Sequence, residues 1–345
     1  MKNTSLADLI QELWFLPRDL VSDAFDQALY RLAEEAPMTI HKVPSGEQCW
    51  TWRVPEKWTC HEAYLETLEG RRLVDFQDHP LHVISYSLPF EGIVSREELL
   101  RHLHVHPRLP EAIPYVFKYY ERDWGLCASQ VLRDSLADAQ YRVVIRTTFE
   151  PGWLKIGEVC VPGECDETIV LVAHLCHPAM VNDDLSGVVV GLEVARRLLA
   201  GPRPHFTYRL LILPETIGSV AYLSRHEALI PKMVGGLFLE MLGNDSPHAL
   251  QGSFQPHSQP DRVFASALRT LDPAAYHAPY RSVINNDERQ FNAPGVRIPM
   301  LSISRVEPPG SAQRPYREYH SSLDTPAIIT PERLAASTEV VLGLL

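Results

Sequence analysis

The sequence predicts an α/β protein with a mixed, largely parallel central sheet, flanked by helices and interrupted by a small inserted α+β subdomain. Short apolar runs without polar alternation are typical of strands that a parallel sheet buries on both faces. Each such run is followed by a helix-like segment or a polar loop, and a Pro-rich stretch of different texture precedes them. The apolar runs lie at residues 168–173, 208–213, 235–239 and 298–303.

Length, composition and net charge limit the number of domains and the classes of partner that we expect. A chain of 345 residues is long for one domain at about 150 residues per domain, and 45% hydrophobic with 22% charged residues is typical of globular proteins. Lys and Arg number 32 against 43 Asp and Glu, which gives a net charge of -11. Because nucleic acids and anionic lipids bind cationic surfaces, we expect neither a nucleic-acid nor a membrane partner.

The N-terminal segment predicts two helices over residues 4–35, with the helical pattern restarting at Ser22 and Asp23. Charged residues such as Asp8 and Glu12 interrupt its apolar residues, so a secretory signal is not expected. Later stretches also fall short of the roughly 18 apolar residues that a membrane span needs. We therefore expect a cytoplasmic protein.

Residues 50–130 differ from the rest, with short β-like runs, many prolines and clustered aromatic residues. We take them as an inserted subdomain, and residues 1–49 with 131–345 as the main domain. The inserted subdomain has two possible roles. Its tryptophans either close off the cleft and restrict it to small substrates, or form a contact in a homo-oligomer. The β-like runs at 141–149 and 153–161 predict a hairpin.

Polar side chains that bind metals follow each of the apolar runs. In an open α/β sheet, ligands bind beyond the carboxyl ends of the strands, so these residues are expected to meet at one edge. Imidazoles and carboxylates are the ligands that zinc takes in proteins. The candidates are His174, His177, Asp183, Glu215, Glu240 and His320.

The order of these motifs resembles the co-catalytic zinc aminopeptidases, α/β metallopeptidases that also include the glutaminyl cyclases and have the zinc-peptidase/phosphorylase-like fold. The resemblance covers about residues 135–345 and the N-terminal helices. It is closest to a subgroup of apparently intracellular aminopeptidase-like proteins with a small inserted domain. The matching segments are H-L-C-H-P from 174, N-D-D-L-S-G from 182, P-E-T-I-G-S from 214, E-M-L-G from 240 and Y-H-S-S-L-D-T from 319.

The resemblance implies a Zn²⁺ cofactor, one or two ions, and a role for each motif residue. Asp183 falls where the family has a carboxylate shared by two metal positions. Glu240 falls at the remaining carboxylate of the first position, and His320 at the histidine of the second. Glu215 falls at the general base, which takes a proton from the attacking water and passes it to the leaving amine.

Two departures from the family pattern concern the metal ligands. Thr216 stands where the family has a second acidic residue that binds metal, so the second position is weakened. Either one ion is held tightly, or Glu215 turns towards the metal. Cys176 replaces the aspartate of the usual His-x-Asp motif, so the histidine ligand is either His177, which we favour on the resemblance, or His174. In an extended strand the two imidazoles point to opposite faces, so both reach one metal only if the chain turns between them.

The segment around residue 287 supplies two candidate substrate-binding residues. Asp287 is expected to orient a ligand or meet a substrate amine, and Arg289 to hold a carboxylate or an oxyanion. The alternative is that the two side chains form a loop ion pair with each other.

The expected reaction is hydrolysis of an amide bond through metal-activated water, with removal of an N-terminal residue from a peptide or small peptide-like conjugate. Three alternatives stay open. The first is cyclising acyl transfer of the glutaminyl-cyclase kind. The second is a serine or cysteine hydrolase that uses Ser186 or Cys176, although no G-x-S-x-G motif is present. The third is a non-catalytic metal-binding protein on a degenerate peptidase scaffold, for which Thr216 is the argument.

Overall fold

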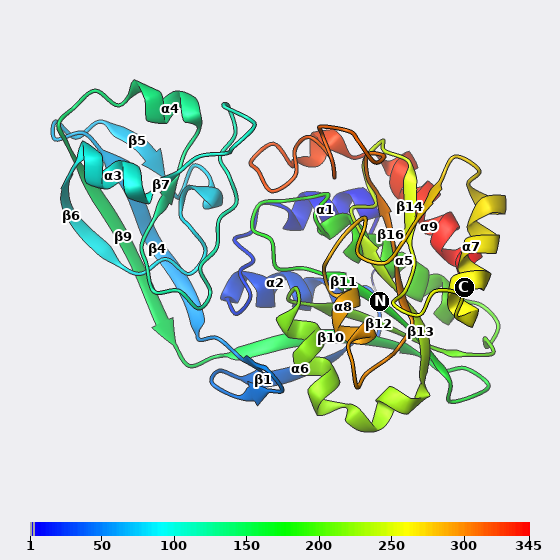
Figure 1. The fold of residues 1–345 in the computed structure, drawn as a ribbon. Coiled ribbons are helices and arrows are strands. Elements are labelled where there is room, and N and C mark those ends of the chain that lie inside the picture. The colour runs from blue at the N-terminus through cyan, green and yellow to red at the C-terminus, as the bar shows by residue number, and fades with distance from the viewer. Residues whose placement is uncertain (1, 3) are drawn as a thin grey trace.

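A mixed eight-stranded sheet forms the centre of the computed structural model, which describes residues 2 and 4–345 (Figure 1). The predicted α/β class is therefore confirmed. In spatial order the strands are β1 (Thr39–Pro44), β10 (Trp153–Val161), β12 (Thr207–Leu213), β11 (Thr168–His174), β13 (Met233–Glu240), β16 (Met300–Arg305), β14 (His248–Gln251) and β15 (Tyr276–Ala278).

The four central strands β12, β11, β13 and β16 are the four apolar runs of the sequence, and they pair with one another in parallel. Every residue of β11 is buried, which explains its lack of polar alternation. β1 and β10 extend one side of the sheet antiparallel, and β14 pairs antiparallel with β16 on the other side. The carboxyl ends of the four central strands consequently meet at one edge.

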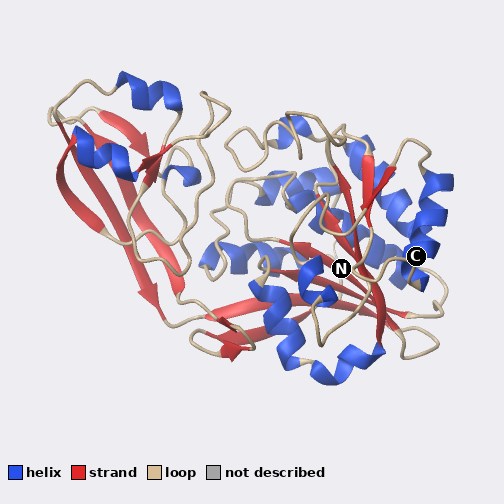
Figure 2. Ribbon diagram, viewed as in Figure 1, coloured by secondary structure: helices blue, strands red, loops and turns tan. Residues whose placement is uncertain are grey.

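Helices cover both faces of this sheet (Figure 2). The helices α1 (Leu6–Leu13), α5 (Leu185–Ala200), α7 (Gln259–Leu271) and α9 (Pro331–Leu344) pack against one another, and α6 (Ile217–Arg225) contacts α8 (Glu288–Asn292). Serine and threonine side chains cap helix N-termini: Ser5 caps α1, Ser22 caps α2 (Asp23–Leu32) and Thr330 caps α9. The two predicted N-terminal helices are confirmed.

A second, antiparallel sheet lies beside the first and contains β5 (Arg72–Asp75), β4 (Lys57–Glu66), β9 (Gln140–Glu150) and β6 (Phe90–Ser95). We call this sheet and its connections the four-stranded unit. The predicted hairpin of β9 with β10 is wrong, because β9 pairs with β4 and β6 while β10 belongs to the main sheet. Pro151 and Gly152 join the two strands, and a side chain at Gly152 would clash with Lys57 at 2.6 Å.

Short elements complete the chain. They are β2 (Gln48–Cys49), β3 (Trp52–Arg53), η1 (Pro80–His82), α3 (Arg96–His102), β7 (Leu103–His104), β8 (Leu126–Cys127), α4 (Gln130–Ser135), η2 (Glu227–Lys232) and η3 (Pro326–Ile328). The domain limits at residues 50 and 130 stay a prediction. Within residues 2 and 4–345, none of the helices has the length and apolar character needed to cross a membrane.

Candidate metal centre

The ends of the parallel strands bring the predicted ligands together. His174 is the last residue of β11 and Glu240 is the last residue of β13, so adjacent strands present both side chains at the same edge. Asp183 lies in the turn before α5, Glu215 follows β12, and His320 lies in the loop after β16. Segments that are distant in the sequence thus converge at one place.

His174, Asp183 and Glu240 form a first group, which we call the first triad. The Nε2 atom of His174 lies 3.3 Å from Oδ1 of Asp183 and 3.5 Å from Oε1 of Glu240. The three potential ligand atoms all lie within 4.8 Å of one another, and all three residues are buried. Burial raises the pKa of Glu240 above its ordinary value, because the charged carboxylate is removed from water.

His177, Asp183 and His320 form a second group, the second triad, around the other oxygen of Asp183. Oδ2 of Asp183 lies 2.9 Å from Nε2 of His320 and 3.9 Å from Nε2 of His177. Burial lowers the pKa of His177 well below its ordinary value, which keeps the imidazole neutral as metal binding requires. Asp183 therefore faces each triad with a different carboxylate oxygen.

Several buried atoms of the two triads have no hydrogen-bond partner in the structure. They are Nε2 of His174, Nε2 of His177, Oδ1 of Asp183 and Oε2 of Glu240. A buried polar atom without a partner costs about 1–3 kcal/mol, so four of them in one cluster need an explanation. Imidazole nitrogens and carboxylate oxygens are zinc ligands, and the donor set therefore fits that metal.

The two histidines that the sequence offered as alternatives both lie in the cluster, one in each triad. The strand ends at His174 and the chain turns before His177, so the opposite directions of an extended strand no longer apply. Their rings lie 4.6 Å apart, one facing each oxygen of Asp183. The structure thus places both imidazoles in the cluster, where they also form a third group of potential ligands with Cys176.

A buried arginine, which the sequence analysis did not single out as functional, supports the loop that carries His177. Arg18 is fully buried and donates hydrogen bonds to the carbonyl oxygens of Leu175 at 3.0 Å, His177 at 2.8 Å and Met180 at 3.0 Å. Burial lowers the pKa of Arg18 to about 10, so the guanidinium stays charged at neutral pH. A charged residue inside an apolar N-terminal segment was the available sequence signal.

Asp324, from the Y-H-S-S-L-D-T segment, holds the turn that carries Asp183. Its carboxylate accepts the backbone N–H of Asn182 at 2.8 Å and of Asp183 at 3.1 Å, and the hydroxyl of Tyr316 at 2.7 Å. The position of Asp183 thus depends on a residue close to His320 in the sequence.

Asp184 has the helix-start role that the motif implies. Its carboxylate accepts the N–H of Gly187 at 3.1 Å, within α5, and of Met241 at 3.0 Å, just after Glu240. A Cβ atom at residue 187 would lie 2.3 Å from Oδ1 of Asp184, so only glycine fits there. The N-D-D-L-S-G motif is therefore a tightly packed helix start with its first aspartate free for the cluster.

Glu215 and Thr216 form the edge of the cluster that is open to solvent. The side chain of Glu215 is 28% exposed, and Oε2 lies 3.6 Å from Nε2 of His177. Thr216 has a φ of 60° and donates its N–H to Oδ1 of Asp287 at 2.9 Å. Cys176 accepts the N–H of Glu215 at 3.1 Å, and burial raises the pKa of the Cys176 thiol to about 11, so it stays protonated.

The two predicted substrate-binding residues lie behind the cluster. Asp287 is fully buried and accepts bonds from the Thr216 N–H and, at 2.6 Å, the Ser219 hydroxyl. Nε of Arg289 donates to the carbonyl of Asn286 at 3.1 Å, and among the described residues no ion pair joins Arg289 to Asp287. Asp287 therefore fixes the turn at Thr216 from inside the protein, and contact of either residue with substrate stays a prediction.

A cavity of about 440 Å³ is lined by Glu215 and by Glu240 of the first triad. Nδ2 of Asn286 donates to Oε1 of Glu240 at 2.6 Å, which leaves Oδ1 of Asn286 buried without a partner. The remaining lining residues are Met241, Val283, Ile284, Asn285, Arg314, Pro315 and Tyr319. The cavity thus combines hydrogen-bond acceptors with an apolar wall.

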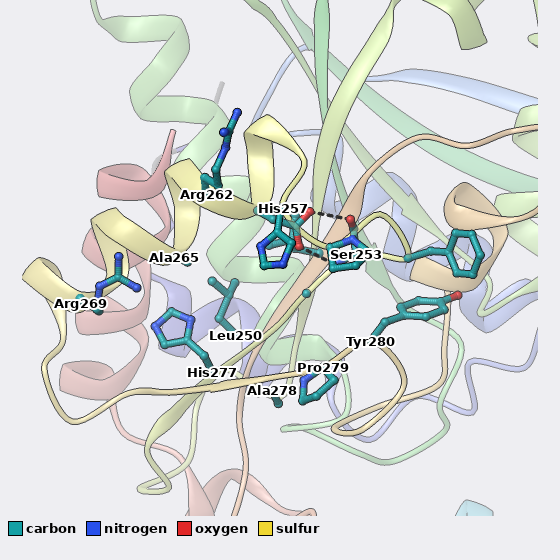
Figure 3. Close-up of a pocket in the computed structure, with 15 residues that line it drawn as sticks. Leu250, Ser253, His257, Arg262, Ala265, Arg269, His277, Ala278, Pro279 and Tyr280 are labelled. Atoms are coloured by element: carbon teal, nitrogen blue, oxygen red, sulfur yellow. Dashed lines mark hydrogen bonds between the residues drawn. The ribbon is translucent and has the colours of Figure 1, made fainter.

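A larger cavity of about 610 Å³ lies elsewhere, between α7 and β15 (Figure 3). Arg262, Arg269, His257 and His277 line it, and all four side chains are exposed. The groups of potential metal ligands found among the described residues lie outside this cavity. Its size alone therefore does not identify it as the reactive site.

Comparison with known proteins gives related chains of similar fold. The profile of a family described as "Domain of unknown function (DUF4910)" matches residues 7–345. A Clostridium acetobutylicum protein, provisionally named a polysaccharide biosynthesis protein with an aminopeptidase-like domain, is 32% identical over 98% of this chain and 76% of its own length. A crystal structure from the same organism, of a protein provisionally named a peptidase, has a TM-score of 0.91 at 31% identity, over 98% of this chain and 78% of that one.

More distant structures share the fold. A zinc aminopeptidase of Bacillus subtilis has a TM-score of 0.70 at 14% identity, over 98% of this chain and 93% of its own. A glutaminyl cyclase from an Acidobacteriales bacterium has a TM-score of 0.58 at 12% identity, over 100% of this chain and 96% of its own. The likeness to zinc aminopeptidases and glutaminyl cyclases that the motifs indicated is therefore confirmed at the level of fold.

Proposed function

Because this chain belongs to the DUF4910 family and has the fold of the zinc aminopeptidases, we propose that it is a zinc-dependent aminopeptidase-like hydrolase of amide bonds. The observation that carries the proposal is the arrangement of two ligand triads on opposite oxygens of Asp183. A carboxylate shared in this way suits two metal ions close together, a known arrangement for hydrolysis.

Each position takes three ligands from the protein. His174, Asp183 and Glu240 would hold the first ion, and His177, Asp183 and His320 would hold the second. His177 replaces the metal-binding carboxylate that is missing at position 216, where this chain has Thr216. Nε2 of His177 is buried, has no hydrogen-bond partner and lies close to the same oxygen of Asp183 as His320 does. This choice replaces the alternatives of a single ion or of Glu215 as a ligand.

The metal and the protein side chains have separate roles in the proposed reaction. Zinc supplies Lewis acidity, which polarises an amide carbonyl and makes water more acidic. Glu215 is partly exposed at the edge of the cluster, where it accepts the proton of the attacking water and passes it to the leaving amine. Asp287 and Cys176 hold the backbone on both sides of Glu215 and so fix its direction.

The adjoining cavity indicates how a substrate lies. Oδ1 of Asn286 is a buried acceptor without a partner, suited to the free ammonium of an N-terminal residue. Met241, Val283 and Ile284 offer an apolar surface for that residue's side chain. We propose a small peptide or peptide-like conjugate with an apolar N-terminal residue as substrate, within the cytoplasm.

The serine-hydrolase alternative loses support from the position of Ser186. Its side chain is fully buried, donates to the carbonyl of Asn182 at 2.7 Å and accepts the N–H of Leu242 at 2.8 Å. A hydroxyl held in this way packs the start of α5 and does not reach a substrate.

Hydrolysis of an aminoacyl anilide tests the proposal. We expect the purified protein to release the aniline from leucyl or methionyl derivatives, to stop after removal of metal by a chelator, and to resume with added Zn²⁺. An N-acetylated substrate is the matched control and should not be cleaved. Release that persists without metal contradicts the proposal, and formation of pyroglutamate from a glutaminyl peptide without cleavage favours the cyclase alternative.

A further inference from the structure

A segment of the four-stranded unit contacts the loop that carries His320. The N–H of Tyr115 donates to the carbonyl of His320 at 2.9 Å, and the N–H of Ser322 donates to the carbonyl of Ile113 at 2.9 Å. The N–H of Ile113 also donates to the hydroxyl of Ser322 at 3.0 Å. These bonds form a short antiparallel pairing between the two loops.

The ring of Tyr115 packs against both imidazoles of the second triad. Its centroid lies 4.9 Å from that of His177 and 5.3 Å from that of His320, with an interplanar angle of 89° to the latter. Tyr319 stacks on His320 at 3.8 Å and 14°. Tyr115 and Tyr319 therefore both restrict the His320 imidazole.

His320 needs such support, because its backbone conformation is unfavourable for a side chain of its size. Its φ is 54°, in the left-handed region that residues other than glycine seldom adopt. Such a conformation persists only where surrounding contacts impose it. The hydrogen bond from Tyr115 to the His320 carbonyl is one of these contacts.

Tyr115 is itself anchored in the four-stranded unit. Its hydroxyl lies 2.6 Å from that of Tyr119, whose ring packs edge-on against Tyr86 at 5.2 Å. Tyr86 stacks on Trp58 of β4 at 5.8 Å. A continuous series of aromatic contacts thus runs from the second sheet to the second triad.

We propose that Tyr115 is a positioning residue, through which the four-stranded unit holds His177 and His320 in the geometry that binds the second metal ion. The inference rests on the proposed function and adds a role for the inserted segment. Among the described residues, Tyr115 makes its ring contacts with the histidines of the second triad, so we expect the first triad to depend less on it. Partners of this kind behind metal ligands typically change metal affinity by about 10–100-fold.

Zinc binding, measured by competition with a chromogenic chelator, tests the inference without reference to activity. We expect wild type to bind two ions, Tyr115→Ala to keep the first ion and to lose about 10–100-fold in affinity for the second, and Tyr115→Phe to bind both nearly as wild type does. Tyr120→Ala is the matched control, because Tyr120 lies on the same segment, is 49% exposed and packs its ring against Trp52. It should bind both ions normally.

Tyr115→Leu is a second test in case the alanine variant does not fold. Leucine keeps the apolar volume of the side chain but removes the aromatic ring. Circular dichroism of the metal-free proteins reports on their folding. If Tyr115→Leu is folded and binds both ions like wild type, or if Tyr120→Ala loses the second ion equally, the inference is overturned. Wild-type protein that binds no zinc overturns the proposed function itself, and wild type that binds one ion removes only the second position.

Discussion

Nε2 of His320 lies 2.9 Å from Oδ2 of Asp183, although the two residues are far apart in the sequence. The other oxygen of Asp183 faces His174 at 3.3 Å. One carboxylate therefore separates two clusters of ligand atoms.

Alanine substitution of the two histidines should remove different ions. His177→Ala is expected to leave one tightly bound zinc ion, held by His174, Asp183 and Glu240, while His174→Ala should weaken that ion and leave the other position intact. Zinc content after dialysis, with measured affinities, separates the two outcomes. His257→Ala, in the distant cavity, is the control. Loss of both ions in each variant would show that the triads are not separate positions.

Glu215→Gln should abolish turnover without removing metal. The amide keeps the size of the side chain but cannot accept a proton, so we expect kcat to fall by about 10²–10⁴-fold. The zinc content should equal that of wild type, because neither triad includes Glu215. Turnover close to the wild-type value would mean that another group moves the proton.

Arg18→Met should destabilise the protein strongly. The substitution leaves the buried carbonyls of Leu175, His177 and Met180 without donors, and we expect the free energy of unfolding to fall by about 3 kcal/mol or more. Denaturant unfolding of the metal-free protein measures the loss. Arg196→Met, at a half-buried site on α5, is the comparison and should cost much less. Equal stabilities of the two variants would contradict the claim that Arg18 stabilises the loop that carries His177.

His248 should make stability depend on pH far from the metal centre. Burial lowers the pKa of His248 to about 4, and the ring contacts Asp272 at 2.7 Å and Ser337 at 3.0 Å. Between pH 6.5 and 4 the unfolded chain binds a proton that the folded chain does not, so stability falls as the pH falls through this range. By pH 5 the loss is about 2 kcal/mol.

Urea unfolding of wild type and His248→Gln between pH 7 and 5 measures this effect. The variant should be less stable at pH 7, where it lacks the native imidazole contacts, yet its stability should change less with pH. Parallel pH profiles for the two proteins would show that His248 does not titrate as its burial implies.

The sequence was sufficient to predict the four central strands of the main sheet. The four central strands are apolar throughout because both faces are covered, and that pattern is legible in a single sequence. The pairing between strands cannot be predicted from a single sequence in this way. β9 and β10 read as a hairpin because they are adjacent and β-like, but the bend at Gly152 directs them into separate sheets. Register and partner choice depend on contacts that local patterns do not contain.

The candidate site shows the same limit. Strand ends located His174, Asp183, Glu240 and His320 at one edge, because parallel strands place their carboxyl ends together. The turn after β11, which separates the two histidines, is held by Arg18 from a distant helix pair and has no local signature.

The burial of Asp287 behind Thr216 likewise follows from tertiary packing. Tyr115 reaches the centre only because an inserted segment folds against the His320 loop, and an aromatic residue in such a segment reads equally well as core.

Metal analysis of wild type and Asp183→Ala tests the central claim most directly. Elemental analysis of the purified, zinc-loaded proteins should find two ions per chain in wild type and a loss of both, or a sharp reduction, in the variant, because each position depends on one oxygen of Asp183. The far-ultraviolet circular dichroism of the variant shows that it is folded. An unchanged zinc content in a folded Asp183→Ala protein would contradict the account.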